Sequence, residues 1–444
     1  MDLLIAFLIF GTVMLLCVSQ GTQYAMLVAL SVGLVTFYTV ARRRGFTKEQ
    51  LFPMMKAGAK RGLIVVKIFI LIGLLTALWR SGGTITFFVY HGIRLIPPGW
   101  FILAGFGLTC LLGYALGTSF GITGTVGVIL MTMARSGGVP PALMAGVVLS
   151  GAYFGDRTSP ASSCANLVAT VTGTDIFDNV RGMLKSGLVP MIATTAFYAF
   201  LSPRYPLTAG DGSLLECIAN SFDLSLWCAL PAVIMLVLPL CKVKVRTAMG
   251  LSAAAAFVLT VTCQGMSLPA AAKAAILGYV PADPVLTDIL SGGGVMSMAV
   301  VSCIIVLSSA YSGIFEGTRM LDGLQERLAV YCKKLTCCGV MAIMSAVIMA
   351  VFCNQTIGIM LIHQLLGPVY EKEGKPVEDM VQDMANTIVV MVALCPWCIA
   401  CAVPLEMLDI GPVAILWGVL LYLLPLWWIG VRLFKDKVKK RAKA

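Results

Sequence analysis

Long apolar runs separated by short polar segments dominate the pattern of this chain. Four runs have no charged residue at all: Leu95 to Ala134, Thr336 to Tyr370, Met384 to Leu405 and Gly411 to Val431. A helix needs about 20 apolar residues to cross the hydrocarbon core of a bilayer, so each run can hold one crossing or a broken pair. The pattern predicts an all-α polytopic membrane protein with about ten to twelve transmembrane helices, some of them broken or re-entrant.

Composition and charge support this prediction. The 444 residues are 59% hydrophobic and 12% charged, and a soluble protein has roughly twice that charged fraction. The net charge is +11, and the basic residues cluster between or after apolar runs, at 42–61, 242–246, 319–334 and 432–443. Such clusters mark cytoplasmic loops, so we expect both termini on the cytoplasmic side and no nucleic-acid partner. The loops 202–222 and 264–290 carry one basic residue each and are expected outside.

The two halves of the chain have similar patterns of interrupted apolar segments. Polar or glycine-rich interruptions recur at offsets of 231, 235 and 227 positions (313 − 82, 354 − 119 and 383 − 156). Two repeats with helices interrupted at matching places are typical of secondary transporters, whose substrate site lies where the interrupted helices meet. We therefore expect a first repeat at 1–205, an external linker at 206–222, and a second repeat at 223–444 that ends in a basic cytoplasmic tail at 432–444.

An isolated carboxylate in the first half is the main candidate for chemistry. Asp156 and Arg157 stand between two uncharged stretches, 136–155 and 158–174. A charge at the bilayer centre costs at least about 3 kcal/mol, so a charge kept there is expected to have a function. The alternative is that both residues mark a helix end at the membrane surface. Pro160 breaks the helix there, and hydroxyl side chains follow. Oxygen donors are the ligands of hard cations, and the same carboxylate can take up a proton.

The expected ion- or substrate-binding residues come from both halves. The first half supplies Thr118, Ser119, Asp156, Thr158, Ser159, Ser162 and Ser163, and the second supplies Asn354, Gln355, Asp383, Asn386 and Thr387. Asp156 and Ser159 are the expected ligands of a transported sodium ion. Arg157 could clamp a substrate carboxylate with two hydrogen bonds or neutralise Asp156. For Asn354 and Gln355, a hydrogen bond between two helices is an equal alternative.

Two other patterns suggest different chemistry. Cys395-Pro-Trp-Cys398 has the spacing of a redox motif, but it lies in an apolar segment rather than at a strand-to-helix turn. Gly117-Thr118-Ser119-Phe120-Gly121 matches the nucleophile elbow of serine hydrolases, yet neither of the two histidines has an obvious carboxylate to orient it. The chain has no Walker-type phosphate loop, so energy for transport would come from an ion gradient. We expect a transporter without a resident cofactor rather than an enzyme.

Close to the whole chain also resembles a known family. The run from Ala145 to Pro160 (AGVVLSGAYFGDRTSP) is similar to the hallmark of the NhaC-type sodium/proton antiporters, and so are segments 74–85, 117–130 and 173–183. The resemblance implies a multi-pass protein of the bacterial inner membrane, built from inverted repeats, that exchanges sodium for protons. Some relatives in this family exchange organic acids such as malate and lactate.

Departures from the family pattern leave the transported solute open. Ser163 and Asn354 stand where the family usually has acidic residues, whereas Asp156 and Asp383 match it. Fewer carboxylates should weaken sodium binding. We therefore expect a cation/proton antiporter that works by alternating access in the lipid bilayer, with a carrier of small organic acids or amino acids as the alternative. Whether the chain forms a homodimer stays open.

Overall fold

The protein is an all-α assembly. The computed structural model describes residues 2–18, 23–208, 213–241, 243–318, 328, 330–332 and 335–441. Across these ranges the regular structure is helical, and the β pairing is limited to an isolated bridge between Tyr279 and Gly292. The predicted fold class is confirmed. Most of the basic segment 319–334 lies outside the described residues.

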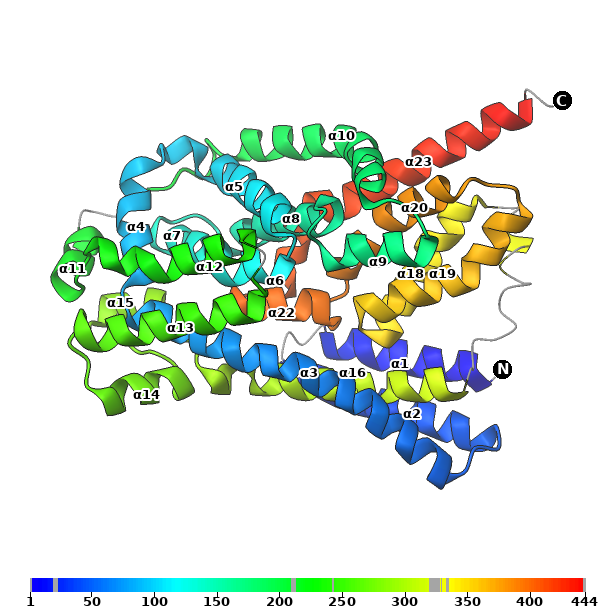
Figure 1. Ribbon diagram of the computed structural model, residues 1–444, viewed down its shortest axis with the longest axis horizontal. Helices are drawn as coiled ribbons and strands as arrows, with labels where there is room; N and C mark the ends of the chain where they lie inside the picture. The colour runs from blue at the N-terminus through cyan, green and yellow to red at the C-terminus, as the bar shows by residue number, and fades with distance from the viewer. Residues whose placement is uncertain are drawn as a thin grey trace.

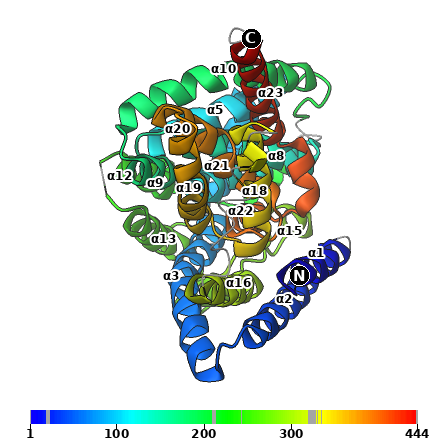
Figure 2. The same cartoon turned by 90° about the vertical axis from the view of Figure 1, so that its right-hand side faces the viewer.

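One group of helices is built around α3 (Lys48–Ser81), the longest of the described helices (Figures 1 and 2). It consists of α1 (Asp2–Val18), α2 (Gln23–Arg43), α3, α13 (Val245–Thr262), α14 (Leu268–Leu277) and α16 (Ala299–Thr318). Helix α16 packs along both α3 and α2, and α13 and α14 flank α3. With 34 residues, α3 is about 51 Å long, which exceeds the hydrocarbon thickness of about 30 Å. Its charged N-terminal part therefore extends beyond the hydrocarbon core.

A second group holds the broken helices. Its first-half members are α5 (Phe101–Leu116), α6 (Ser119–Ile122), η2 (Thr123–Gly127), α7 (Val128–Ser136), α8 (Pro141–Thr158), α9 (Ser163–Thr172) and α10 (Ile176–Leu201). Its second-half members are α18 (Cys337–Phe352), α19 (Gln355–Lys372), α20 (Val377–Asn386), α21 (Ile388–Met391), η5 (Val392–Leu394), α22 (Ile399–Met407), η6 (Pro412–Trp417) and α23 (Val419–Arg441). Helix α8 packs against α5 and η6, and α10 against α23, so the two halves interlock.

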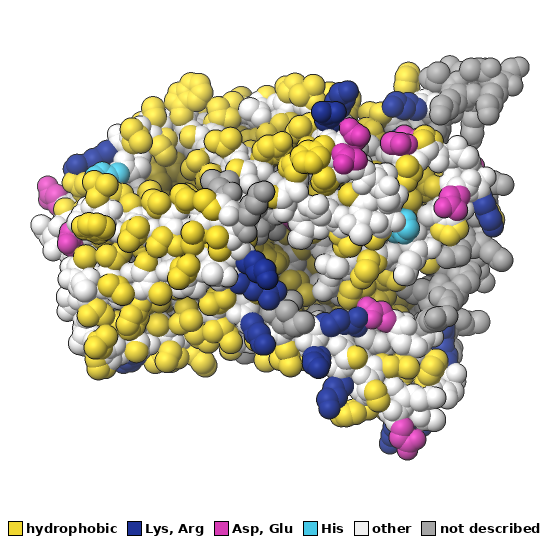
Figure 3. Space-filling view, viewed as in Figure 1, with side chains coloured by type: hydrophobic (Ala, Val, Ile, Leu, Met, Phe, Trp, Pro, Cys, Tyr) yellow, Lys and Arg dark blue, Asp and Glu magenta, His cyan; other side chains and the backbone are white. Residues whose placement is uncertain are grey.

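Shorter elements complete the fold. These are α4 (Thr84–Leu95), η1 (Pro98–Trp100), α11 (Ser213–Ser221), η3 (Leu226–Ala229), α12 (Leu230–Leu240), α15 (Pro284–Leu290) and η4 (Val295–Met298). Figure 3 shows hydrophobic side chains covering the left part of the visible face, over α12, α13 and α14. A surface of this kind suits lipid rather than water.

The described helices confirm a multi-pass membrane protein. Six of them are long and apolar enough to cross a membrane, and up to eight cross if each of two bent pairs counts as one span. The bent pairs are Leu215–Ser221 with Leu226–Pro239, at 101°, and Val377–Leu394 with Ile399–Met407, at 51°. The sequence predicted about ten to twelve spans. The lower count arises because apolar segments such as Cys337–Phe352 end early at breaks and fall short of the length of a full span.

Helix boundaries recur along the chain with one constant offset. Helix α5 begins and ends 236 positions before α18 (337 − 101 and 352 − 116). The segment from α6 to α7 precedes α19 by the same 236 positions (355 − 119 and 372 − 136). Helix α8 likewise precedes the segment Val377–Leu394 (377 − 141 and 394 − 158). This agreement supports two structural repeats in the chain.

The constant offset corrects one pairing expected from the sequence. Asp156 and Asp383 are 227 positions apart (383 − 156), nine fewer than the 236 that relates the helices. The position equivalent to Asp156 is Val392, and the position equivalent to Asp383 is Val147. The two carboxylates resemble each other chemically but do not occupy equivalent places in the two repeats.

Candidate functional site

Two helix breaks with the same geometry meet at the site. Gly117 ends α5 and Cys353 ends α18, and both have left-handed backbones, with φ of 62° and 53°. The next residue in each case caps the following helix. The Thr118 hydroxyl accepts a hydrogen bond from Gly121 N, and Asn354 Oδ1 accepts one from Ile357 N, both at 3.2 Å. Such caps satisfy amide groups that the break would leave without partners.

Close packing fixes the position of the first break. A Cβ atom on Gly117 would lie 2.5 Å from the backbone of Ala161, in the loop between α8 and α9. One on Gly155, in the last turn of α8, would lie 2.2 Å from the backbone of Gly113 in α5. Small residues allow helix backbones to approach closely inside a membrane. Glycine therefore brings the end of α8 against the break in α5.

Asp156 lies in that last turn of α8, with 4% of its surface exposed. The Ser162 hydroxyl donates a 2.8 Å hydrogen bond to Asp156 Oδ1. The Ser162 oxygen also caps α9 by accepting from Cys164 N and Ala165 N. No ion pair among the described residues includes Asp156. The carboxylate is thus buried, accepts a hydrogen bond from Ser162, and has no cationic partner in the described ranges.

A cavity of about 180 Å³ joins Asp156 to both helix breaks. Six predicted site residues line it: Thr118, Ser119, Asp156, Ser163, Asn354 and Gln355. The sequence analysis missed six others: Ile68, Phe120, Cys164, Thr356, Ile399 and Ala400. Thr356 and Cys164 directly follow predicted residues, so their neighbours gave a signal. The apolar wall gave none, because Ile68 and Ile399 look like ordinary residues of membrane helices.

Several polar groups of the lining remain available to a ligand. Gln355 Nε2 donates to Val389 O at 2.9 Å, and this bond leaves the amide oxygen of Gln355 as an acceptor. Ser119, Ser163 and Thr356 contribute hydroxyl groups. A carboxylate, an amide oxygen and hydroxyl oxygens form the kind of donor set that binds hard cations.

Thr158 and Ser159, two other predicted site residues of the first half, make hydrogen bonds with the nearby backbone. Thr158 Oγ1 donates to Phe154 O at 2.6 Å inside α8, and Ser159 Oγ accepts from Ala161 N at 3.1 Å. Neither residue lines the cavity. Ser162 does not line it either, but contacts Asp156 directly.

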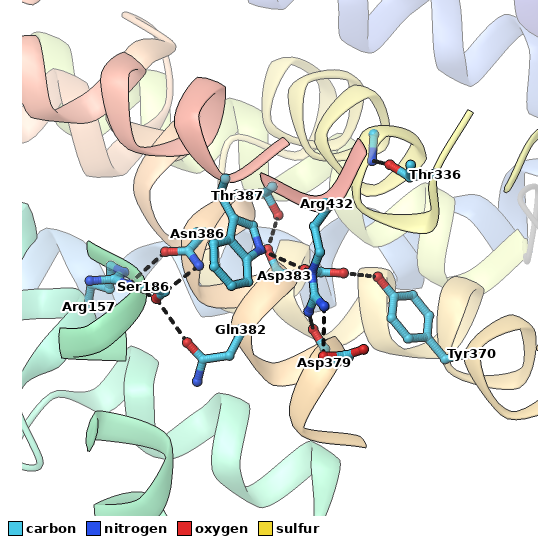
Figure 4. A network of polar contacts seen from close by, with 12 residues as sticks. Arg157, Ser186, Thr336, Tyr370, Asp379, Gln382, Asp383, Asn386, Thr387 and Arg432 are labelled. Atoms are coloured by element: carbon cyan, nitrogen blue, oxygen red, sulfur yellow. Dashed lines mark hydrogen bonds and ion pairs between the residues drawn. The ribbon is translucent and has the colours of Figure 1, made fainter. Parts of the chain in front are cut away.

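Arg157 points away from the cavity. Its Nη2 atom donates to Met183 O (2.6 Å), Ser186 Oγ (2.8 Å) and Asn386 Oδ1 (2.7 Å), as Figure 4 shows for Ser186 and Asn386. Its Nε and Nη1 atoms are buried and have no partner in the described part of the chain. Arg157 therefore connects α8 to α10 and α20, and it makes no ion pair with Asp156 there.

Asp383 belongs to a separate network (Figure 4). Its Oδ1 atom accepts hydrogen bonds from Arg432 Nε and Trp428 Nε1, each at 2.7 Å, and Oδ2 accepts from the Tyr370 hydroxyl at 2.6 Å. Arg432 also pairs with Asp379 at 2.7 Å. These contacts join α19, α20 and α23. The structure places Asp383 in this network and outside the cavity lining.

The other second-half candidates also lie outside the cavity. Asn386 accepts from Arg157, and its Nδ2 atom donates to Ser186 Oγ at 3.3 Å. Thr387 Oγ1 donates to the Asp383 carbonyl at 2.6 Å. The structure therefore gathers six of the predicted residues, Asp156 among them, around one cavity. It places Asp383 and Asn386 in contacts between helices and Thr387 in a local backbone contact.

A second cavity is lined mainly by residues of the second half of the chain. It has a volume of about 250 Å³, and its lining includes Ile304, Ala402, Glu406 and Asp409. Ile304 is 236 positions after Ile68 (304 − 68), so the two cavities have equivalent residues of α3 and α16 in their walls. Arg135 holds Asp409 in an ion pair at 3.1 Å.

Comparison with known proteins identifies the family of this chain. A family model described as the Na+/H+ antiporter family matches residues 151–435. The chain belongs to this family. The match includes Asp156, the second helix break and the Asp383 network.

Similar proteins carry several names. A malate-2H+/Na+-lactate antiporter of Bacillus subtilis is 29% identical over 303 residues, which cover 67% of this chain and 64% of that protein. The arginine/ornithine antiporter ArcD of Halobacterium salinarum is 28% identical over 293 residues, or 64% of this chain and 60% of ArcD. The Na+/H+ antiporter NhaC of Alkalihalophilus pseudofirmus is 24% identical over 285 residues, or 63% and 62%. Each match covers less than two thirds of the relative's own length.

Proposed function

We propose that this protein is a secondary active transporter that exchanges sodium for protons by alternating access, with Asp156 as the shared carrier. The observation that carries the proposal is the position of Asp156, which is buried in a cavity bounded by both helix breaks and has no cationic partner in the part of the chain that the structure describes. An unpaired carboxylate inside a membrane protein is costly unless a cation or a proton neutralises it. Membership of the Na+/H+ antiporter family supports the same function.

Each loaded state uses the cavity in a different way. In the cation-loaded state, Asp156, the Gln355 amide oxygen and nearby hydroxyls replace water around sodium. In the proton-loaded state, the carboxyl group is neutral and the cation has left. Sodium and protons compete for one group, so the apparent KM for sodium should rise as the pH falls.

The experiment that tests this function measures proton movement in proteoliposomes that contain a pH-sensitive dye. Sodium added outside should drive protons out of the vesicles, and lithium or potassium serves to rank cations. Liposomes without protein report the leak. If sodium moves no protons while a carboxylic acid or an amino acid does, the sodium/proton function is wrong.

A second candidate function is the exchange of a small organic solute. The cavity volume of about 180 Å³ equals roughly six water molecules, which is more than a bare ion requires. Phe120 and Ile399 add apolar walls to it, and relatives are named for malate, lactate, arginine and ornithine. Arg157 gives this alternative little support, because its guanidinium points to Asn386 rather than into the cavity.

The placement of the chain in the cell is part of the proposal. The basic clusters at 42–61 and 432–443 favour cytoplasmic termini in a bacterial inner membrane. The constant offset of helix bounds supports a division into two repeats, which we place at 1–205 and 223–444, with 206–222 as an external linker. Accessibility of single introduced cysteines in these loops would test the orientation.

A further inference from the structure

The ionisable groups around the cavity are few. Asp156 is the single carboxylate among the lining residues, all of which belong to the described part of the chain. The other polar lining residues carry hydroxyl, amide or thiol groups. Lys67, next to Ile68 in sequence, is exposed on α3 and does not line the cavity.

The neighbouring buried charges are committed to other contacts. Arg157 donates to three acceptors on α10 and α20, and Asp383 accepts from Arg432, Trp428 and Tyr370 (Figure 4). Neither side chain lines the cavity. Their charges therefore stay constant whether Asp156 holds a cation or a proton.

The second repeat contributes no equivalent charge. The residue 236 positions after Asp156 is Val392, and the cavity residue that the second break supplies is the neutral Asn354. The internal symmetry therefore duplicates the helix break without duplicating the carboxylate. One negative charge is available for a transported ion.

Electrostatics then limits what the cavity can carry. A net charge inside a low-dielectric protein costs several kcal/mol, so neutral states are favoured during the conformational change. Asp156 with one monovalent cation is neutral, and so is Asp156 with one proton. The empty carboxylate, a bound divalent cation and a pair of monovalent cations each leave one uncompensated charge.

From this charge count we infer that the cavity exchanges one monovalent cation for one proton, so that the transport cycle moves no net charge. This inference rests on the proposed sodium/proton function and adds its stoichiometry and its selectivity against divalent cations. It also explains why the exchange is coupled: the empty, charged site crosses poorly, so a site that has released a cation must bind a proton before it can return.

Proteoliposomes with a set membrane potential provide the test. Potassium and valinomycin impose a potential of either sign, and the dye reports the initial rate of sodium-driven proton movement. The rate should change by less than about twofold between the two signs, because no net charge crosses the membrane. A second assay makes sodium and protons both tenfold more concentrated outside at zero potential. One-for-one exchange is then at equilibrium, whereas exchange of two protons per sodium carries protons inward. Vesicles with Asp156→Asn correct for the leak.

The possible outcomes separate the two proposals. If sodium drives proton movement and the potential changes its rate severalfold, the one-for-one inference is wrong and the antiporter function stands. If sodium moves no protons under any gradient, both are wrong. The inference is also contradicted if calcium or magnesium drives proton movement at the same rate as sodium.

Asn354→Asp tests the charge count directly. Aspartate caps a helix as well as asparagine does, so the cap on Ile357 N should survive while the cavity gains a second carboxylate. The variant should become sensitive to the membrane potential or accept a divalent cation. A variant that exchanges sodium but shows neither change contradicts the idea that lining carboxylates set the transported charge.

Discussion

Asp156 and Arg157 are adjacent in the chain, yet their side chains belong to different environments. The Asp156 carboxylate lines the cavity and accepts from Ser162, while the Arg157 guanidinium donates to Asn386 on α20. Successive residues of an α-helix point about 100° apart, so α8 directs one charge toward the helix breaks and the other toward its neighbouring helices. The arginine anchors the helix, and the carboxylate has no ion pair with any described residue.

Asp156→Asn should abolish sodium-driven proton movement. Asparagine keeps the shape of the side chain and can still accept from Ser162, but it cannot carry a proton or neutralise a cation. Membrane insertion and the elution profile in detergent should match those of the wild type. The measurement is the initial rate of dye response in proteoliposomes.

Asp178→Asn is the matched control for this prediction. Asp178 lies on α10, where it forms an exposed ion pair with Arg181 at 3.3 Å. Exposed pairs contribute little to stability, so this variant should exchange ions at nearly the wild-type rate. Near-normal exchange by Asp156→Asn would remove Asp156 from the mechanism.

Asp383→Ala should reduce stability more than any loss of an exposed carboxylate. Its side chain is 3% exposed and that of Arg432 is 11% exposed, and removing one partner of a buried pair typically costs about 3–5 kcal/mol. The Trp428 and Tyr370 donors also lose their acceptor. The unfolding temperature in detergent should drop clearly, while Asp178→Ala should leave it unchanged. Equal unfolding temperatures for the two variants would contradict the role of Asp383 in holding α19, α20 and α23 together.

The sequence predicted the helix breaks and the carboxylate because their signals are local. Glycine and polar residues that interrupt an apolar run are visible at Ser119 and Asn354, and an isolated charge is visible at Asp156. The role of Asp383 was not visible, because its partner Arg432 lies 49 positions away, in a tail expected to be cytoplasmic. Chemical likeness also paired Asp383 with Asp156, whereas helix bounds pair Asp156 with Val392.

Arg157→Lys distinguishes an anchoring role from a substrate clamp. Lysine lacks the planar fork that reaches Met183 O, Ser186 and Asn386, so we expect a loss of about 1–3 kcal/mol for each acceptor left unsatisfied. Sodium-driven exchange should persist at a reduced level in the protein that folds, because Arg157 does not line the cavity. The measurements are the unfolding temperature and the exchange rate for each amount of inserted protein.

Combining Arg157→Lys with a substitution of its partner Asn386 makes the Arg157 prediction more specific. Asn386→Ala should lower the unfolding temperature, and its effect should be less than additive with that of Arg157→Lys, because the two residues share a hydrogen bond. Normal stability with complete loss of transport in Arg157→Lys would instead indicate that the guanidinium binds the solute.

Gly155→Ala should impair both folding and transport through a single methyl group. The added Cβ would lie 2.2 Å from the Gly113 carbonyl carbon, and backbone atoms cannot rotate away as a side chain can. Overpacking of this kind costs about 1–3 kcal/mol, and α8 must move away from α5, taking Asp156 with it. We expect a lower unfolding temperature and at least a tenfold slower exchange. Gly107→Ala is the matched control on α5, because a Cβ there has no atom within 4 Å. If both alanine variants exchange sodium at the wild-type rate, contact between α5 and α8 does not position the carboxylate.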